Sequence, residues 1–366
     1  MKKVLFIVFG GVNKPSTYYR VVQFLNKIHE SKQDFVYEML TTPQKPAVRH
    51  YPKILRGLVH ALNLVKFYYL ICYYVIRYAD SVFIQKTILP QFIIRLIKFR
   101  NIPFLFDFDD AIYASFSEIK KKRKSKIQAL AFMLKHANTV LAGNRVLGEY
   151  ATQFRPDCEI TPTVIDLDNY CALKNTQYFN YTIGWIGTSQ NLVFLEMLVK
   201  PLRVLRQEFP QLKLLVICDK PFVLDDFTVN KQWRRETYIE DMLSMDIGVM
   251  PLVEDKWTRG KCSFKAIQYM ALGIPVVVSP VGMNTEVVQD GISGYLASTD
   301  EEWVLRLRNL IIDRKLRQAF AIAGRKKVED NYSLQAWIHK WYNLAIGEKK
   351  VVVWYSLISV LSQNLQ

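Results

Sequence analysis

The chain has 366 residues, of which 50% are hydrophobic and 22% are charged. This balance excludes a largely disordered chain, a collagen and a long coiled coil. At ~150 residues per domain, the length predicts about two domains. The formal net charge is +16, and residues 1–170 carry most of it, with 25 Lys and Arg against 13 Asp and Glu. This excess predicts an anionic partner, such as phosphate groups, nucleic acid or a lipid surface.

The cysteine and histidine residues show no metal-binding spacing. The five cysteines form no CxxC pair and the five histidines form no HExxH motif, so we expect no structural zinc. Scattered thiols in odd number are typical of a reduced cytoplasmic protein, which is the location that we expect.

Two apolar runs raise the question of a membrane segment. Residues 4–9 follow two lysines, but the run is short and leads into two glycines rather than a cleavage site, so a buried strand is the better prediction than a signal peptide. Residues 67–76 form an uncharged run between Lys66 and Arg77, well short of the ~20 residues of a spanning helix. We predict a packed core helix there, and the alternative is a helix that lies in a membrane interface.

Strand-like and helix-like runs alternate along the chain. From the N-terminus we predict a strand at 4–9, a helix at 18–29, a strand at 81–85, a helix at 91–99, a strand at 103–108, a helix at 115–135, strands at 139–142 and 159–164, and then a polar connector at 166–178. The alternation restarts with a strand at 182–186, a helix at 192–209, a strand at 213–217, a short helix at 238–244, a strand at 247–251, a helix at 263–272, a strand at 275–278, a helix from about 285 and helices beyond 300.

Such alternation indicates βαβ units and parallel sheets. We therefore predict an α/β protein of two Rossmann-like α/β/α domains, at residues 1–170 and 171–334, whose sheets face a central cleft. A C-terminal helix at about 335–366 could pack back on the first domain. Ligands in such folds bind beyond the carboxyl ends of the strands, so the residues directly after each strand are the candidate site residues.

Polar residues follow two strands of the predicted first domain. Gly10 and Gly11 allow a tight turn and a close approach by a ligand, although the sequence is not GxGxxG and indicates no dinucleotide site. Asp107, Asp109 and Asp110 come at the end of another strand. Carboxylates this close need cations, hydrogen bonds or raised pKa values, so a metal site, a general base and a helix cap are alternatives.

Two strand ends of the second domain offer backbone N–H groups at the start of a helix. Gly187 and Thr188 open one helix, and Asn284 and Thr285 open another. Such positions suit a phosphate group, and an ordinary turn is the alternative.

The segment 257–279 carries the strongest signal. Lys265 and Gln268 lie on one face of the predicted helix, and Lys261 joins them if the first turn extends back to it. Two lysines beside a strand end could neutralise a diphosphate, and a glutamine one turn further could hold paired hydroxyl groups. A solvated basic helix start is the alternative.

This segment resembles the retaining glycosyltransferases of family 4, which have the two-domain GT-B fold. The stretch Gln268-Tyr-Met-Ala-Leu-Gly-Ile-Pro-Val-Val matches the second half of the family motif, and Lys265 matches a common variant with lysine three residues before the second acidic position. Three more stretches fit neighbouring family segments: residues 184–188, 246–252 and 281–296. The resemblance is strong over 181–330 and thinner over 1–170.

The chain departs from the family pattern at three positions. The first Glu of the motif falls on Gly260 and the second on Gln268, and Cys218 replaces a glycine after the second strand of this domain. By resemblance the second position holds the donor ribose, which an amide can also do, whereas the first contacts the sugar, which Gly260 cannot do. These changes point to an altered donor or to an inactive homologue.

The resemblance implies transfer of a sugar from a UDP- or GDP-sugar to a hydroxyl group with retention of configuration, no metal and no other cofactor. The negative charge of the leaving diphosphate would be stabilised by Arg259, Lys261 and Lys265. Further hydrogen-bond donors to the diphosphate would come from Gly187, Thr188, Asn284 and Thr285. The donor ribose would be held by Gln268. Asp109 or Asp110 would orient the acceptor or act as base, and Gly11, Lys14 and Arg20 would line the acceptor side.

The implied acceptor is a saccharide or lipid-linked saccharide in surface polysaccharide synthesis. Residues 120–126 hold six basic side chains, either as a solvated helix face or as a contact to a membrane or an anionic acceptor. No nucleic-acid-binding pattern accompanies the charge, so we expect no nucleic-acid partner. We expect a cytoplasmic enzyme, peripheral on the inner face of the membrane. The alternative is an inactive GT-B protein that binds a nucleotide or a membrane.

Overall fold

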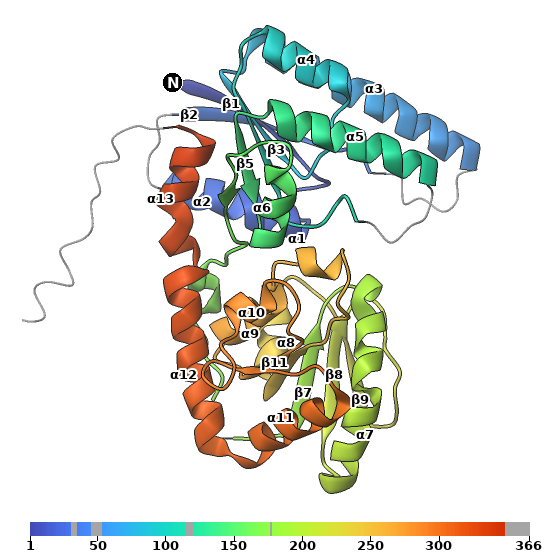
Figure 1. Cartoon of the computed structure of the whole chain (residues 1–366), viewed down its shortest axis with the longest axis vertical. Coiled ribbons are helices and arrows are strands. Elements are labelled where there is room, and N and C mark those ends of the chain that lie inside the picture. The colour runs from blue at the N-terminus through green and yellow to red at the C-terminus, as the bar shows by residue number, and fades with distance from the viewer. Residues whose placement is uncertain (31–34, 45–52, 115–119, 176–177, 348–366) are drawn as a thin grey trace, which may run out of the picture.

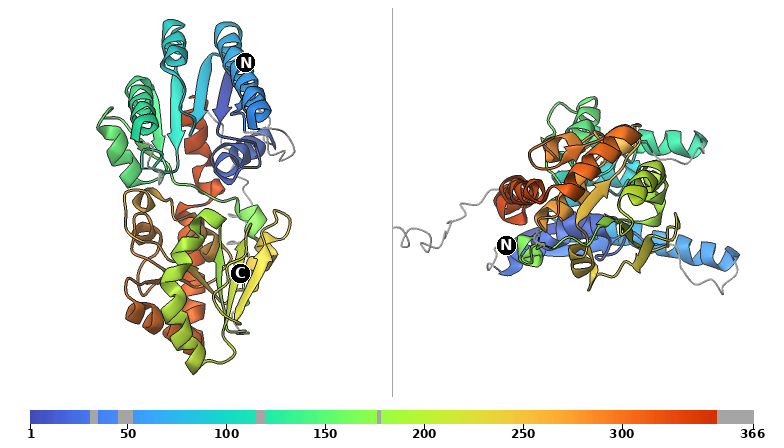
Figure 2. Two further views of the ribbon diagram at one scale, coloured as in Figure 1. Left: turned by 90° about the vertical axis from the view of Figure 1, so that its right-hand side faces the viewer. Right: turned by 90° about the horizontal axis from the view of Figure 1, so that it is seen from below.

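The computed structural model describes residues 1–30, 35–44, 53–114, 120–175 and 178–347. They form two α/β domains, one above the other, and each is built on a six-stranded parallel sheet with helices on both faces (Figure 1). Figure 2 shows the two domains from two further sides. Residues that follow strands of one sheet contact residues that follow strands of the other. The predicted fold class is confirmed.

The first sheet has the strand order β2-β1-β3-β4-β5-β6. Its strands are β1 (Lys2–Val8), β2 (Phe35–Thr41), β3 (Ser81–Gln85), β4 (Phe104–Phe108), β5 (Thr139–Ala142) and β6 (Glu159–Ile160). Five of them lie at predicted positions. The sequence analysis missed β2, because this edge strand buries only Phe35 and so lacks the apolar run of a central strand.

Alternate side chains of β1 enter two different layers. One layer contains Leu5 and Ile7 and the helices α3 (Lys53–Arg77), α4 (Gln91–Phe99), α5 (Lys120–His136) and α6 (Arg145–Thr152). The other contains Val4, Phe6 and Val8 and the helices α2 (Gln23–Glu30) and α13 (Leu334–Ala345). The short α1 (Pro15–Thr17) and a π-helical turn at Tyr18–Val22 lead from β1 into α2.

The second sheet has the strand order β12-β11-β10-β7-β8-β9. Its strands are β7 (Thr182–Ile186), β8 (Lys213–Cys218), β9 (Thr228–Gln232), β10 (Ile247–Met250), β11 (Val276–Val278) and β12 (Tyr295–Leu296). Its helices are α7 (Val199–Glu208), α8 (Tyr238–Leu243), α9 (Phe264–Ala271), α10 (Asn284–Val287), α11 (Asp300–Ile312) and α12 (Arg314–Asn331). The helix predicted at 192–209 is divided into a 3₁₀-helix at Ser189–Leu198 and α7. Pro201 lies in the first turn of α7, where its missing N–H group breaks no hydrogen bond within the helix.

The last helix, α13, returns to the first domain (Figure 1). Trp341 is 1% exposed and stacks on Phe24 of α2, with ring centroids 4.6 Å apart. It also lies parallel to the ring of Phe6 in β1, at 6.4 Å. The helix therefore completes the core of the first domain. The remainder of the predicted C-terminal helix, residues 348–366, lies outside the described residues.

Helix α3 differs from the predicted core helix at 67–76. Phe67, Ile71 and Val75 are buried against the first domain, but the helix begins much earlier, at Lys53. Within the described part of the chain, Ile54–Arg77 is long and apolar enough to cross a membrane, and only 17% of its most apolar window is buried. The prediction of a core helix therefore holds only for the face that carries the three buried side chains.

Candidate active site

The two domains contact each other through residues that follow their strands. The thiol of Cys262, before α9, donates to the main-chain oxygen of Asp109, after β4, at 3.2 Å. Asn144, after β5, donates to the main-chain oxygen of Lys261 at 3.1 Å. An ideal Cβ on Gly260 would lie 2.6 Å from the Cβ of Ala111. The Asp109 and Lys261 segments therefore lie directly against one another.

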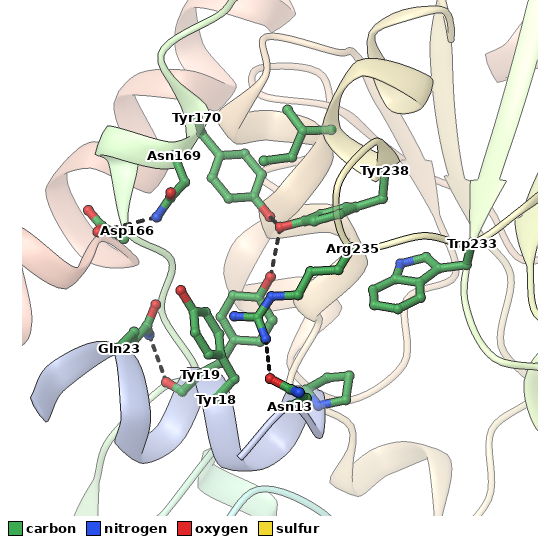
Figure 3. Close-up of a pocket in the computed structure, with 12 residues that line it drawn as sticks. Asn13, Tyr18, Tyr19, Gln23, Asp166, Asn169, Tyr170, Trp233, Arg235 and Tyr238 are labelled. Carbon is green, nitrogen blue, oxygen red and sulfur yellow. Dashed lines mark hydrogen bonds between the residues drawn. The ribbon is translucent and has the colours of Figure 1, made fainter. Parts of the chain in front are cut away.

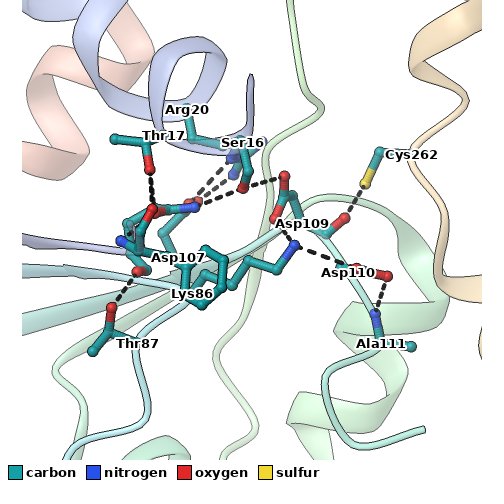
Figure 4. A network of polar contacts seen from close by, with 12 residues as sticks. Ser16, Thr17, Arg20, Lys86, Thr87, Asp107, Asp109, Asp110, Ala111 and Cys262 are labelled. Atoms are coloured by element: carbon teal, nitrogen blue, oxygen red, sulfur yellow. Dashed lines mark hydrogen bonds and ion pairs between the residues drawn. The ribbon is translucent and has the colours of Figure 1, made fainter. Parts of the chain in front are cut away.

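Arg20 and Asp107 form a buried ion pair just inside the first domain (Figure 4). Nε of Arg20 donates to Oδ2 of Asp107 at 3.1 Å, Nη2 donates to Oδ1, and Nη1 donates to the main-chain oxygen of Thr161 at 2.6 Å. Burial raises the pKa of Asp107, and Arg20 opposes that effect. Arg20, expected on the acceptor side, therefore ties β4 to the segment after β6 instead of facing the boundary.

Asp109 and Asp110 share one cation, Lys86, which follows β3 (Figure 4). Nζ of Lys86 lies 3.2 Å from Oδ1 of Asp109 and 3.3 Å from Oδ2 of Asp110, and Oγ of Ser16 donates to Oδ2 of Asp109 at 2.6 Å. Although burial opposes ionisation, Lys86 and Arg20 hold the pKa of Asp109 below its usual range, so Asp109 is a carboxylate. Asp110 is the more exposed of the two, at 31% against 12%.

The carboxylates at the end of β4 are thus neutralised by two cationic side chains of the first domain, Arg20 and Lys86. In the described ranges no group of three or more His, Cys, Asp or Glu side chains is placed to hold a metal ion. Lys86 was missed by the sequence analysis, although it directly follows a predicted strand. Its φ of 52° is uncommon for a residue with a side chain, and such backbone conformations concentrate at functional sites.

Lys261 and Lys265 lie on the other side of the boundary and, among the described residues, form no ion pair with a carboxylate. Nζ of Lys261 donates to Oδ1 of Asn191 at 3.0 Å and lies 3.5 Å from the centre of the Trp257 ring. Nζ of Lys265 lies 5.4 Å from the centre of the Trp185 ring. Burial, together with the charge of Lys261, lowers the pKa of Lys265 to about 7, and burial also lowers that of Lys261. Two such cations would gain from a multiply charged anion.

The glycine loop after β7 is in contact with Lys265. An ideal Cβ on Gly187 would lie 2.9 Å from Cε of Lys265, so a larger residue would displace the lysine. Thr188 follows and precedes the 3₁₀-helix. The N–H group of the next residue, Ser189, donates to Oδ1 of Asp219 at 2.7 Å, so a carboxylate already lies at the start of this 3₁₀-helix.

Asn284 and Thr285 make their side-chain hydrogen bonds close to their own loop. Asn284 is 1% exposed, accepts from Oγ of Ser263 at 2.7 Å and donates to the main-chain oxygen of Ser279 at 2.9 Å. Oγ1 of Thr285 donates to the main-chain oxygen of Gly282 at 3.0 Å. These residues fold the loop that supports α9.

Three further predicted residues are exposed, one in the 3₁₀-helix at Thr258–Gly260 and two in the turn after β1. Arg259 is 53% exposed, and its Nε lies 3.9 Å from Glu254. Gly11 and Lys14 are exposed in the turn after β1. The structure gives these residues no contact with the two lysines or the two carboxylates.

Gln268 contacts a cluster of tyrosine hydroxyl groups where the domains join; the three tyrosines of this cluster, Tyr19, Tyr170 and Tyr238, are drawn in Figure 3. Nε2 of Gln268 donates to the hydroxyl of Tyr170, which lies 3.3 Å from that of Tyr238, and Tyr238 lies 3.0 Å from Tyr19. Burial raises the pKa of Tyr19 and Tyr170, so both are neutral. The three tyrosines come from the first domain, the connector and α8, and no sequence spacing predicts that they meet.

A hollow of about 140 Å³ lies beside this cluster. At its edge Arg235 stacks on the ring of Tyr18 at 4.3 Å and donates to Oδ1 of Asn13 at 2.6 Å, which joins the second domain to the first (Figure 3). The hollow is smaller than the ~300 Å³ of a typical ligand pocket. A nucleotide would therefore need more room than this hollow offers.

Comparison with known proteins defines the class of fold. Residues 180–313, most of the second domain, match the family model described as Glycosyl transferases group 1. No curated protein matches the sequence. The matched stretch includes the glycine loop after β7, Lys261 and Lys265, so the family model covers the second-domain half of the candidate site.

Three solved structures resemble the whole chain. Sucrose-phosphate synthase from Thermosynechococcus elongatus has a TM-score of 0.70 at 13% identity, over 94% of this chain and 98% of that one. HepE of Anabaena, solved with UDP and glucose, has a TM-score of 0.68 at 14% identity, over 95% and 100%. WaaG, a glycosyltransferase involved in lipopolysaccharide biosynthesis, has a TM-score of 0.65 at 13% identity, over 94% and 100%. The chain has the two-domain GT-B fold.

Proposed function

We propose that the protein is a glycosyltransferase that moves a sugar from a UDP- or GDP-sugar to a saccharide or lipid-linked saccharide acceptor in surface polysaccharide synthesis. One observation carries the proposal. Lys261 and Lys265, without a carboxylate partner among the described residues, lie across the domain boundary from the Asp109–Asp110 pair, and the Cys262–Asp109 contact joins the two segments.

The chemistry requires both halves of this arrangement. The bond between the sugar C1 and the diphosphate oxygen breaks, a bond between C1 and the acceptor oxygen forms, and the acceptor loses its hydroxyl proton. Lys261 and Lys265 would stabilise the negative charge that develops on the diphosphate. Asp110, the more exposed carboxylate, would orient the acceptor hydroxyl or take its proton. We propose a metal-independent reaction with retention of configuration and a cytoplasmic location.

The matched family and the neighbours support the donor class. HepE of Anabaena was solved in complex with UDP and glucose, and the family model covers the segment with the two lysines. A UDP-sugar is therefore the first donor to test, and a GDP-sugar is the second. The family 4 assignment rests on the motif around Gln268.

A non-catalytic GT-B protein that binds a nucleotide or a membrane is the second candidate. Two observations favour it: no side chain occupies position 260, where the family motif has its first Glu, and the amide of Gln268 is already bonded to Tyr170 at 2.9 Å.

A nucleotide screen followed by a turnover assay separates the two candidates. Thermal shift with UDP, GDP and their sugars should reveal a ligand that stabilises the native state. The same donor should then be hydrolysed or transferred, in the presence of EDTA as well as in its absence. Stabilisation by a nucleotide without turnover of any nucleotide sugar would favour the non-catalytic candidate.

A further inference from the structure

Helix α3 carries a long apolar stripe on the side opposite its buried face. At about 100° per residue, the stripe falls within an arc of about 100°, whereas Phe67, Ile71 and Val75 point the other way and are buried. Its members are 45% to 87% exposed: Ile54, Leu58, Leu62, Val65, Tyr69, Tyr73 and Ile76. An apolar surface of this length in water marks a contact with another apolar phase or molecule.

The N-terminal half of α3 projects from the rest of the domain (Figures 1 and 2). Leu55 and Val59, beside the stripe, are 41% and 38% exposed as well. The fully buried side chains of α3 all belong to its C-terminal half, where three partly buried side chains also pack against the first domain: Tyr68, Cys72 and Tyr74. Among residues 54–65 no side chain is fully buried in the described fold, and the exposed apolar side chains of the N-terminal half need another explanation.

The charges around the stripe indicate what covers it. Helices α3 and α4 contain no acidic residue, and Lys66 and Arg77 lie at the edge of the stripe, both exposed. Helix α5 packs on the other side of α4 and begins with the basic run 120–126, although the side chains of residues 120–124 lie outside the described residues. A second copy of the chain would bring like charges together. An anionic bilayer attracts them and accepts the apolar stripe.

A groove lies beside this surface and reaches toward the turn after β1. It has a volume of about 350 Å³ and lies between α3 and the end of β2. Lys66 and Asn63 line it from α3, and Gln44 lines it from the other side. Nε2 of Gln44 would lie 2.7 Å from an ideal Cβ on Gly10, so the groove ends at the turn after β1.

We propose that α3 lies in the interface of an anionic bilayer, with the stripe Ile54–Ile76 at the acyl boundary and with Lys66 and Arg77 among the headgroups. In this position the groove opens beside the membrane surface and leads toward the turn after β1. The docking surface is inferred from exposure and charge alone. Only the consequence, access to a lipid-linked acceptor, rests on the proposed function.

Vesicle binding of the full-length protein tests the surface. The wild type should sediment with vesicles of equimolar phosphatidylcholine and phosphatidylglycerol and bind about tenfold less to phosphatidylcholine alone. The double substitution Leu58→Glu/Leu62→Glu should reduce binding to the anionic vesicles at least about tenfold. The matched control, Ile312→Glu/Ile322→Glu, alters two side chains of the second domain that are 65% and 72% exposed and should bind as the wild type does.

Two outcomes would overturn the proposal. One is equal vesicle binding by the stripe variant and the control, or no binding by the wild type. The other is a wild-type dimer that the stripe substitutions convert to a monomer, as measured by sedimentation equilibrium, without vesicle binding. Transfer to a soluble acceptor should be unchanged in the stripe variant. Vesicle binding without any sugar transfer would therefore refute the proposed function and leave the docking surface standing.

Discussion

Cys262 of the second domain donates its thiol hydrogen to the main-chain oxygen of Asp109 in the first domain, at 3.2 Å. Burial raises the pKa of Cys262, so the thiol stays protonated and can keep donating. Lys261 directly precedes Cys262 and Asp110 directly follows Asp109, so this one contact brings the basic segment to the acidic one. In the proposed function, donor and acceptor therefore meet only while the two domains are closed on each other.

Replacement of Lys265 by alanine should weaken nucleotide binding. A diphosphate would lose a charged partner, worth about 1.5–3 kcal/mol, which corresponds to a tenfold or greater rise in the Kd for UDP or GDP. Lys256→Ala is the matched control, because Lys256 is an exposed lysine of the preceding loop. Calorimetry on both variants measures the difference. Unchanged affinity in Lys265→Ala would show that the diphosphate binds elsewhere.

The two carboxylates should have different roles: Asp109 should stabilise the fold, and Asp110 should act on the acceptor. Asp109→Asn leaves Lys86 with one carboxylate in a buried site and should destabilise the protein by about 3 kcal/mol. Asp110→Asn also leaves Lys86 with one carboxylate, but it changes a more exposed side chain whose amide oxygen can still accept from the N–H group of Ala111. It should therefore cost about 1 kcal/mol or less while slowing transfer about a hundredfold. Thermal unfolding and turnover with a soluble acceptor measure the two effects. If both variants transfer sugar at the wild-type rate, neither carboxylate acts on the acceptor.

Elements with strong apolar runs were predictable from the sequence, and the central strands β1, β3, β4, β7 and β10 lie where expected. The edge strands β2 and β9 were not predicted, because each of them buries at most one side chain. Sequence also placed Lys261 and Lys265 after β10 and the carboxylates at the end of β4. It could not show that Lys86 neutralises those carboxylates, because this pairing depends on the order in which the parallel strands lie side by side.

The role of Arg20 shows the same limit. A basic residue soon after a glycine turn is compatible with a ligand contact and with an internal ion pair. Only the position of Asp107, 87 residues away along the chain, decides between them. The tyrosine cluster at Gln268 is a similar case, since its members become neighbours only when the domains and the connector are assembled.

Donor binding should take up a proton above neutral pH. The pKa of Lys265 is lowered to about 7 by burial and by Lys261, so at pH 8 the free protein holds this lysine mostly neutral. A bound diphosphate favours the cation, so binding raises the pKa and draws in up to one proton. At pH 6 the lysine is already charged, and uptake by this group should be small. Affinity for UDP-glucose, or for the GDP-sugar if UDP does not bind, should fall between pH 7 and pH 9, by at most about tenfold per pH unit.

Calorimetry at pH 8 in two buffers of different ionisation enthalpy measures this uptake directly. Lys265→Arg provides the control, because a guanidinium remains charged throughout this range and should abolish both the uptake and the pH dependence. Proton uptake that is equal in the wild type and in Lys265→Arg would assign the titration to another group.

Position 260 should not accept the glutamate of the family motif. An ideal Cβ there would lie 2.6 Å from the Cβ of Ala111 and 3.1 Å from its main-chain nitrogen, so any side chain pushes the two domains apart. Gly260→Ala should cost about 1–3 kcal/mol and slow transfer, and Gly260→Glu should slow it further instead of improving it. Ala111→Gly removes the closest colliding atom, so Gly260→Ala/Ala111→Gly should recover part of both losses. Thermal unfolding and turnover across this double-mutant cycle measure the coupling. Additive effects, or a gain of activity in Gly260→Glu, would show that the domains do not close through this contact during the reaction.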